Sequence, residues 1–420
     1  MQEKIEEIQE TDLNKAVALP VQKQERIETL DILRGFALLG IFLIHMPVWF
    51  GSPAMYLEAL GKNLWTSPWD TTAQSFIGIF ALGKFYTMFA FLFGLGFVIF
   101  FERAKARISN PIPLFFKRLF ILLIIGLLHA FFIWHGDVLV LYALFGFLLP
   151  AFLSRKPRTL IIWAVVFLSI FLLIVALAVL ALGLIPDTMR AEMIYEMKST
   201  LANSFYAYGE GNFSAIMAQR STDVLMMYSN LLVIFFAYFP LFLLGVYVAK
   251  KGVFQNIEAN LGFIKKAWIW GLIIGLPMSI VAYIASHHAD HLFFNSYTLI
   301  QYSAGILGNT GLSIFYMTSI ILLCRRETWA SRFKPFAYVG RMALSNYLLQ
   351  SIIGTLIFYS YGLGLYGQIA PAFGMVLALI IFAIQIIISK WWLEHYQFGP
   401  MEWTWKSLTY GKRFENKISK

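Results

Sequence analysis

Long apolar segments recur along the chain, and they constrain its fold more than any other feature. Ten of them approach or exceed the roughly 18 residues that cross the hydrocarbon core of a bilayer as a helix. Of the 420 residues, 59% are hydrophobic and only 13% are charged. This composition indicates a polytopic membrane protein. We therefore predict an all-α fold with about ten transmembrane helices and the lipid bilayer as its main partner. The predicted spans lie near residues 30–50, 76–101, 115–134, 138–154, 159–185, 226–249, 267–286, 299–323, 337–360 and 369–393.

Lysine and arginine residues gather in alternate loops between these segments. The loops on the same side as the N-terminus carry basic clusters and the opposite loops carry few, which is the positive-inside pattern. We therefore expect both termini in the cytoplasm. The net charge of +10 follows from this topology, so we predict no nucleic-acid partner. The predicted cytoplasmic loops are 102–117, 155–158, 250–266, 325–334 and the tail after 390.

The spans divide the chain into four regions. Residues 1–25 are polar and lack the apolar core of a signal peptide, so we expect a cytoplasmic tail. Residues 26–185 form an N-terminal unit of five helices. Residues 186–225 form a long outer loop, in which the amphipathic stretch 187–207 predicts a short surface helix. Residues 226–420 supply five further helices and a cytoplasmic tail.

The first apolar segment contains three ionisable side chains, Asp31, Arg34 and His45. Such residues are costly at membrane depth and are usually paired or functional. Arg34 and His45 are eleven residues apart, which is roughly 16 Å and three helical turns, so they share one face with Asp31 nearby. His45 has the pKa range of a base or proton relay. The alternative is a histidine that only bonds a neighbouring helix.

The third apolar segment repeats this pattern. Arg118 and His129 are again eleven residues apart, and His135 and Asp137 follow in the outer turn. Two buried imidazoles at one depth favour a shared site. Asp137 either caps the next helix or orients a histidine, as carboxylates do for catalytic imidazoles.

Other polar residues are candidates for binding. Arg341, Asn346 and Gln350 belong to a polar stripe in the ninth predicted span, and Asn346 and Gln350 share a helix face. They either line a substrate path or join helices by hydrogen bonds. Arg103 and Arg118 belong to a basic cluster that suits an anionic donor or a lipid headgroup.

Sequence motifs for metal or nucleotide binding are weak. His287, His288, Asp290 and His291 lie close together, but a zinc site needs a complete ligand set, so we predict no metal. The chain has no Walker A pattern, which argues against ATP-driven transport. We expect no bound cofactor.

The opening Arg26-x-x-x-Leu30-Asp31-x-x-Arg34-Gly35 resembles the first helix of the membrane acyltransferase superfamily. That superfamily includes bacterial O-acetyltransferases and the lysosomal heparan-alpha-glucosaminide N-acetyltransferase. Nearly the whole chain resembles the YeiB family of bacterial multi-pass membrane proteins. The residues that carry this likeness are Arg118 to His129, Gly136-Asp137-Val138-Leu139, Gly340 to Tyr347 and Gly399-Pro400-Met401-Glu402-Trp403-x-Trp405.

The superfamily resemblance implies acyl transfer in the bacterial cell membrane, with residues 26–185 as the acyltransferase-like core. An acyl-CoA co-substrate would dock at the cytoplasmic mouth, with Arg34, Arg103 and Arg118 meeting its phosphates. His45 would then act as base on a hydroxyl or amine of a small-molecule or glycan acceptor. His129 and Asp137 would assist. The alternative is a transporter or exporter whose polar stripes line a path for an unmodified solute. Both a monomer and an oligomer are compatible with the sequence.

Overall fold

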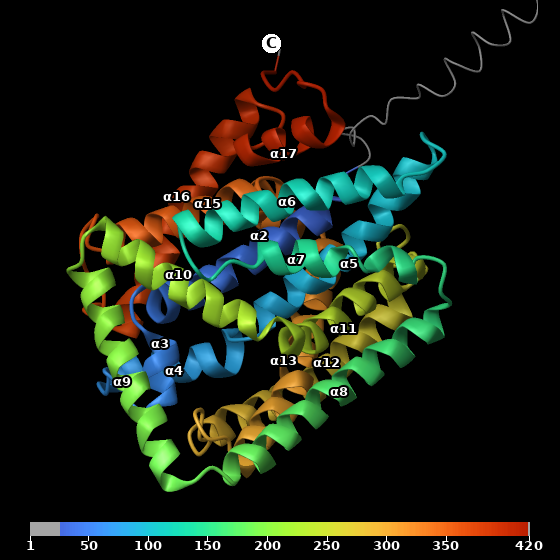
Figure 1. Ribbon diagram of the computed structural model, residues 1–420. Coiled ribbons are helices and arrows are strands. Elements are labelled where there is room, and N and C mark those ends of the chain that lie inside the picture. The colour runs from blue at the N-terminus through green and yellow to red at the C-terminus, as the bar shows by residue number, and fades with distance from the viewer. Residues whose placement is uncertain (1–25, 419–420) are drawn as a thin grey trace, which may run out of the picture.

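The computed structural model describes residues 26–418, and within that range the chain forms helices and no β-strand. The predicted all-α polytopic class is confirmed. The predicted tail 1–25 lies outside the described residues. In Figure 1, α9 runs down the left side of the molecule, α10 crosses from the upper left toward the middle, and α17 lies at the top. The helices before the outer loop are α2 (Glu28–Ile44), η2 (His45–Phe50), α3 (Ala54–Ala59), α4 (Pro68–Phe76), η3 (Ile77–Ala81), α5 (Lys84–Lys105), α6 (Ile112–Phe132), α7 (Leu139–Gly146), η4 (Leu149–Phe152) and α8 (Pro157–Gly183). The remaining helices are α9 (Asp187–Gly209), α10 (Phe213–Ser229), α11 (Leu231–Lys250), α12 (Leu261–Ser286), α13 (Ser296–Cys324), α14 (Glu327–Arg341), α15 (Ala343–Phe358), α16 (Pro371–His395) and α17 (Pro400–Tyr410).

Eight helical segments in the described range are long and apolar enough to cross a membrane. Two of the ten predicted spans are built differently. The segment 138–154 is the short α7 followed by the 3-10 turn η4, and 337–360 is divided between the end of α14 and α15. The break at Met342 separates a polar helix from an apolar one, which a hydropathy count over the whole segment averages together.

The short helix α7 returns along α6 in a hairpin. Asp137 lies beside Gly126 at one end, and the rings of Phe116 and Phe147 are 5.5 Å apart at the other. The pair therefore runs antiparallel, so α7 and η4 bring the chain back toward the side on which α6 begins. This arrangement keeps the predicted loop 155–158 on the basic side.

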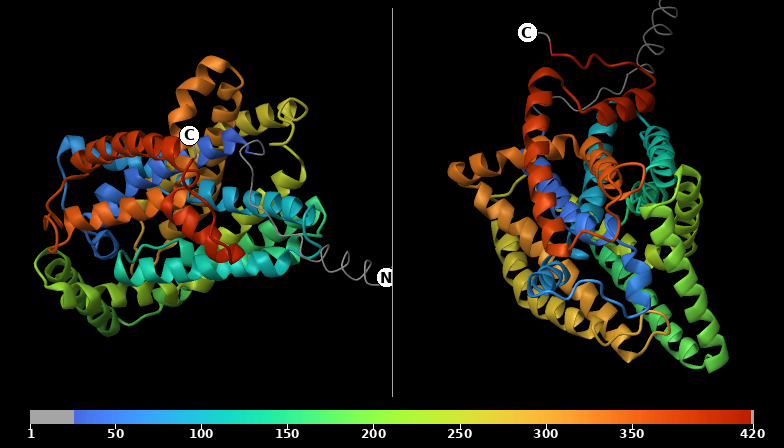
Figure 2. Two further views of the ribbon diagram at one scale, coloured as in Figure 1. Left: turned by 90° about the horizontal axis from the view of Figure 1, so that it is seen from above. Right: turned by 90° about the vertical axis from the view of Figure 1, so that its left-hand side faces the viewer.

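The outer loop is more ordered than a single surface helix. Residues 187–229 form two helices, α9 and α10, and Figure 2 shows them lying along one flank of the helical body. Two large apolar cores fill that body, and each contains residues from before and after the outer loop. The two halves of the chain therefore pack against each other throughout.

Helix α2, which carries Asp31 and Arg34 and leads directly into His45, packs closely against α14. A Cβ atom at Gly35 would collide with the carbonyl of Phe336, and one at Gly340 would collide with the carbonyl of Asp31. Small residues permit such backbone approach between membrane helices. The contact fixes the polar start of α2 beside the end of α14.

Three contacts join segments that the basic-loop pattern predicts to be cytoplasmic. Lys250 Nζ donates to the carbonyl of Arg155 at 2.7 Å. Arg325 makes a bidentate ion pair with Glu258 at 2.9 Å. Helix α17 docks on the start of α6, where Trp405 Nε1 donates to the carbonyl of Arg118. We call this basic end of the molecule the inner end and the opposite end the outer end.

Candidate functional site

A cavity of about 430 Å³ opens at the inner end between α2, α5, α6, α15 and α17. We call it the inner cavity. Its lining includes seven basic side chains and two acidic ones. The basic residues are Arg26, Arg34, Arg103, Arg107, Arg118, Arg341 and Lys406. Such an excess of positive charge favours a ligand with several negative charges.

Both acidic residues of the inner cavity are engaged within the protein. Arg34 Nη1 donates to Asp31 Oδ1 at 2.9 Å, one helical turn away. Glu402 accepts from the backbone N–H groups of Leu344 and Ser345 and from the Ser345 hydroxyl. Glu402 therefore caps the start of α15 and ties α17 to it.

Helix α17 places an aromatic and a cationic group over the cavity mouth. The Arg118 guanidinium lies 3.7 Å from the centre of the Trp405 ring, which holds the arginine side chain by cation–π contact. Lys406 lies 3.4 Å from the centre of the Phe398 ring. Burial, together with the nearby charges of Arg26 and Arg118, lowers the pKa of Lys406 to about 7. This lysine therefore titrates near neutral pH.

The interior of the inner cavity is apolar and ends at aromatic hydroxyl groups. Leu38, Ile41 and Phe89 line its walls, and Tyr142 and Tyr347 also contribute. The Tyr347 hydroxyl donates to the carbonyl of Gly136, and the Tyr142 hydroxyl donates to the carbonyl of Tyr86. The cavity thus joins a cationic mouth to a chamber that suits a hydrocarbon chain.

Three histidines surround one buried tryptophan beyond this chamber. Trp134 is 2% exposed, and its ring centre lies 4.6 Å from His45, 6.4 Å from His129 and 5.6 Å from His135. We call these four residues the histidine cluster. The expected meeting of His45 and His129 therefore occurs around a shared aromatic neighbour.

His129 and Asp137 form a buried pair. His129 Nδ1 lies 2.7 Å from Asp137 Oδ2, and the other carboxylate oxygen accepts from the N–H of Val140 at 2.7 Å. Asp137 thus both caps α7 and orients a histidine, so the two readings of this residue are compatible. Among the described residues His129 Nε2 has no hydrogen-bond partner. The His129 ring contacts Tyr347, with 5.2 Å between ring centres.

His45 lies where α2 changes into the π-helical turn His45–Phe50, which contains Pro47. Such turns are often found at functional sites. His45 Nε2 and the Tyr86 hydroxyl are 2.6 Å apart, and the imidazole is 2% exposed. The backbone carbonyl of Tyr86 accepts the hydrogen bond from the Tyr142 hydroxyl described above. Tyr142, which lines the inner cavity, is therefore connected with His45 through Tyr86.

The candidate residues fall into separate groups. Asp31, Arg34, Arg103, Arg118 and Arg341 all line the inner cavity. Asn346 donates to Ser389 and to the carbonyl of Val339, and Gln350 donates to Gln385. These two amides join α15 to α16, and neither lines the inner cavity. Their contacts match the alternative in which these residues join helices by hydrogen bonds.

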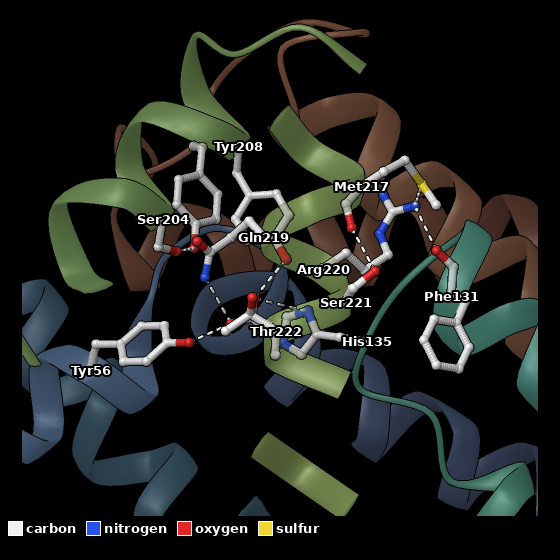
Figure 3. A network of polar contacts seen from close by, with 12 residues as sticks. Tyr56, Phe131, His135, Ser204, Tyr208, Met217, Gln219, Arg220, Ser221 and Thr222 are labelled. Carbon is white, nitrogen blue, oxygen red and sulfur yellow. Dashed lines mark hydrogen bonds and ion pairs between the residues drawn. The ribbon is translucent and has the colours of Figure 1, made fainter. Parts of the chain in front are cut away.

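His135 belongs to an outer network and does not line the inner cavity. Its Nδ1 lies 3.9 Å from Asp223 Oδ2. Asp223 also accepts from the hydroxyls of Tyr56 and Tyr208 and from the Gln219 amide. Figure 3 shows Tyr56, Tyr208, Gln219 and His135, the four partners of this carboxylate, grouped at one place. The network fastens α3, α9 and α10 over the histidine cluster.

The outer histidines that follow α12 do not assemble a metal-ligand set. Within residues 26–418, no group of three or more His, Cys, Asp or Glu side chains is placed to hold a metal ion. His291 instead lies 3.4 Å from Glu58.

Several residues of the site were not among the candidates chosen from the sequence. Trp405 and Lys406 stand at the cavity mouth, and Tyr86 and Trp134 contact the histidines. The aromatic residues are common among 12 Trp and 20 Tyr in this chain, so composition alone cannot select them. Trp405 does belong to the motif Gly399-Pro400-Met401-Glu402-Trp403-x-Trp405, but the motif does not say which cavity the side chain reaches.

Comparisons with known proteins give a consistent result. The chain is 36% identical over 405 residues to "Uncharacterized protein YxaH" of Bacillus subtilis, covering 93% of this chain and 96% of the relative. It is 29% identical over 401 residues to "Uncharacterized protein YeiB" of Escherichia coli, covering 92% and 96%. A family model described as "Protein of unknown function (DUF418)" matches residues 248–412. This range includes α17 and the residues of α14 and α15 that line the inner cavity. The chain therefore belongs to the DUF418 family, together with its YxaH and YeiB relatives.

Proposed function

We propose that this membrane protein transfers an acyl group from a cytoplasmic acyl-CoA to an acceptor hydroxyl or amine that enters from the outer side. The observation that carries this proposal is the inner cavity, which joins seven basic side chains to an apolar chamber. The phosphates of a coenzyme A would bind the arginines at the mouth, and the acyl chain would enter the chamber. Arg34 and Arg118 are the main candidates for phosphate contact, because guanidinium groups bind phosphate in a bidentate manner.

His45 is the proposed base. The acceptor oxygen or nitrogen would form a bond to the thioester carbonyl carbon as its proton passes to His45. The carbon–sulfur bond then breaks, and the proton passes from His45 to the departing thiolate. Tyr86, which is hydrogen-bonded to His45, would hold the imidazole in place.

His129 and Asp137 are proposed to assist. A carboxylate that accepts from His129 Nδ1 stabilises a positive imidazole. Such a cation near the chamber would stabilise the negative oxygen that develops on the carbonyl during transfer. The contact between His129 and Tyr347, a residue that lines the chamber, supports this role.

The test is acyl-CoA turnover by the purified protein in nanodiscs with bacterial envelope lipid and glycan extracts as acceptors. Wild-type protein should release free coenzyme A and label an acceptor when the acyl group carries a radiolabel. His45→Gln should lose this activity and keep acyl-CoA binding. Unchanged turnover in His45→Gln would contradict the proposed base.

Transport is the second candidate, and one observation favours it. The inner cavity and a second cavity at the outer end are both lined by residues close in sequence to His45 and Tyr86: Ile41 and Phe89 line the first, and Val48 and Thr87 line the second. A proton-coupled exporter would use such a central histidine as a relay. A transporter should move an unmodified solute in proteoliposomes without an acyl donor, whereas the proposed enzyme requires the donor.

A further inference from the structure

The second cavity lies at the outer end of the molecule and measures about 1760 Å³. We call it the outer cavity. It is bounded by α3, α5, α8, α9, α11 and α13. Its volume exceeds the roughly 300–1,000 Å³ of a typical small-molecule site, so it has space for a large ligand.

A buried cation forms part of the wall of the outer cavity. Lys84 is 2% exposed, lies in the second apolar span and lines the cavity. Its Nζ donates to the carbonyl of Gly78 at 3.1 Å, which uses one of three ammonium donors. No ion pair to Lys84 is found in the described part of the chain. A buried ammonium without a carboxylate partner is costly, and a bound anion would offset that cost.

The backbone at this point also favours an anion. The second span is interrupted at Gly83, which has a φ of +83°, and α5 starts at Lys84 without a side-chain cap. Helix α5 has 22 residues, and the N-terminus of such a helix carries partial positive charge. Interrupted membrane helices often direct their N-termini at anionic groups of a substrate. The Lys84 ammonium and the α5 dipole thus act on the same position.

The walls of the outer cavity are largely apolar. Phe171 and Val175 of α8 face it together with Ala237 and Leu241 of α11. This lining suits a hydrocarbon chain rather than a freely soluble anion. Lys62 lies at the exposed edge of the same cavity.

We propose that the outer cavity binds an anionic amphiphile, with its phosphate at Lys84 and the N-terminus of α5 and its hydrocarbon chain against α8 and α11. If the proposed function holds, this amphiphile is the acyl acceptor; that point alone rests on the proposed function. Val48 and Thr87 line the cavity and lie three and one residues from His45 and Tyr86 in the sequence, so the cavity reaches the segments that carry the proposed base and its tyrosine partner.

The test measures equilibrium binding of radiolabelled dioleoyl phosphatidic acid to the full-length protein in detergent micelles. The neutral probe is dioleoylglycerol, and the soluble probe is glycerol 3-phosphate. Lys84→Met should weaken phosphatidic acid binding about tenfold or more, the loss of one charge-assisted contact. Lys84→Arg should largely retain binding. Lys62→Met is the matched control for an exposed lysine at the same cavity and should change little.

A second variant obstructs the cavity without touching the charge. A Cβ atom at Gly305 would meet only Ala282 Cβ, at 4.0 Å, and Gly305 lines the outer cavity. Gly305→Leu should therefore fold and weaken amphiphile binding, because its side chain fills part of the cavity. Gly262→Leu is its control, because a Cβ atom there meets nothing within 4 Å and Gly262 lies outside the cavity.

Three results would overturn the inference. They are equal affinity for phosphatidic acid and dioleoylglycerol, affinity for glycerol 3-phosphate that matches phosphatidic acid, and wild-type binding in both Lys84→Met and Gly305→Leu. Because these measurements use no acyl-CoA, they are independent of the proposed reaction. Amphiphile binding without any acyl transfer would contradict the proposed function and leave the outer site standing.

Discussion

His129 Nδ1 and Asp137 Oδ2 are 2.7 Å apart, and both side chains are almost fully buried. The pair joins the last turn of α6 to the start of α7, because Asp137 also accepts from the N–H of Val140. A buried carboxylate is retained only when its oxygens are bonded, as they are here. The ion pair therefore stabilises the α6–α7 hairpin and also orients the His129 imidazole toward Tyr347.

Replacing each of two histidines should separate the base from the assisting group. We expect His45→Gln to reduce acyl transfer by about 10²–10⁴-fold, the usual contribution of a general base. His129→Gln should cause a smaller loss and should also lower thermal stability, because it leaves the Asp137 carboxylate without its histidine. Turnover rate and melting temperature, measured on the same preparations, check both statements. A smaller loss in His45→Gln than in His129→Gln would reverse the assigned roles.

The contact between Arg118 and Trp405 should matter for donor affinity. Trp405→Leu removes both the ring beneath the guanidinium and the bond to the Arg118 carbonyl. We expect acyl-CoA binding to weaken about tenfold, consistent with one cation–π contact and one hydrogen bond. Isothermal titration with acetyl-CoA measures the effect, and Trp391→Leu, an exposed tryptophan outside the inner cavity, is the control. Equal losses in the two variants would point to a general effect on folding.

Donor binding should depend on the charge of Lys406. Its pKa is lowered to about 7, so in the free protein it is protonated below that pH and neutral above it. An anionic ligand binds the protonated form more tightly. Affinity for acyl-CoA should therefore fall as the pH rises from about 6 to about 8. In Lys406→Arg the guanidinium remains charged throughout this range, and the fall should become shallower; an unchanged profile in that variant would contradict the role of Lys406.

The close contact of α2 with α14 leads to a stability prediction. Gly340→Ala places a Cβ atom against the carbonyl of Asp31, so we expect overpacking to destabilise the fold by about 1–3 kcal/mol. Gly262→Ala, where a Cβ atom has open space in α12, should be neutral or slightly stabilising, since alanine favours a helix. Thermal unfolding of both variants gives the comparison. A Gly340→Ala protein as stable as Gly262→Ala would show that α14 can move away from α2.

Much of the architecture was predictable because hydrophobic length is a direct signal of membrane spans. The prediction was less accurate where packing rather than hydropathy decides the structure. Helix α7 is too short to cross a bilayer alone, yet its position beside α6 returns the chain to the inner end. Likewise, residues 187–229 form two helices held by contacts to Asp223 from three separate elements, which no local pattern encodes.

The candidate site was only partly predictable. The arginines were identifiable because they lie within or next to the apolar spans at the basic side of the chain, and Arg34, Arg103, Arg118 and Arg341 line one cavity. Asn346 and Gln350 looked similar in sequence, but only the fold reveals their partners on α16. Trp405 could not be assigned in advance, because it reaches the cavity through the docking of α17 far along the chain.

The most direct test of the acyl-transfer account is the binding of acetyl-CoA and longer acyl-CoAs to the purified full-length protein by thermal shift, because a ligand that binds the folded state raises its melting temperature. Arg34→Ala and Arg118→Met should lose most of the stabilisation, His45→Gln should retain it, and Arg155→Gln, an exposed arginine outside the inner cavity, should behave as wild type. The absence of any shift with every acyl-CoA, or a shift that survives in both Arg34→Ala and Arg118→Met, would contradict a donor site in the inner cavity.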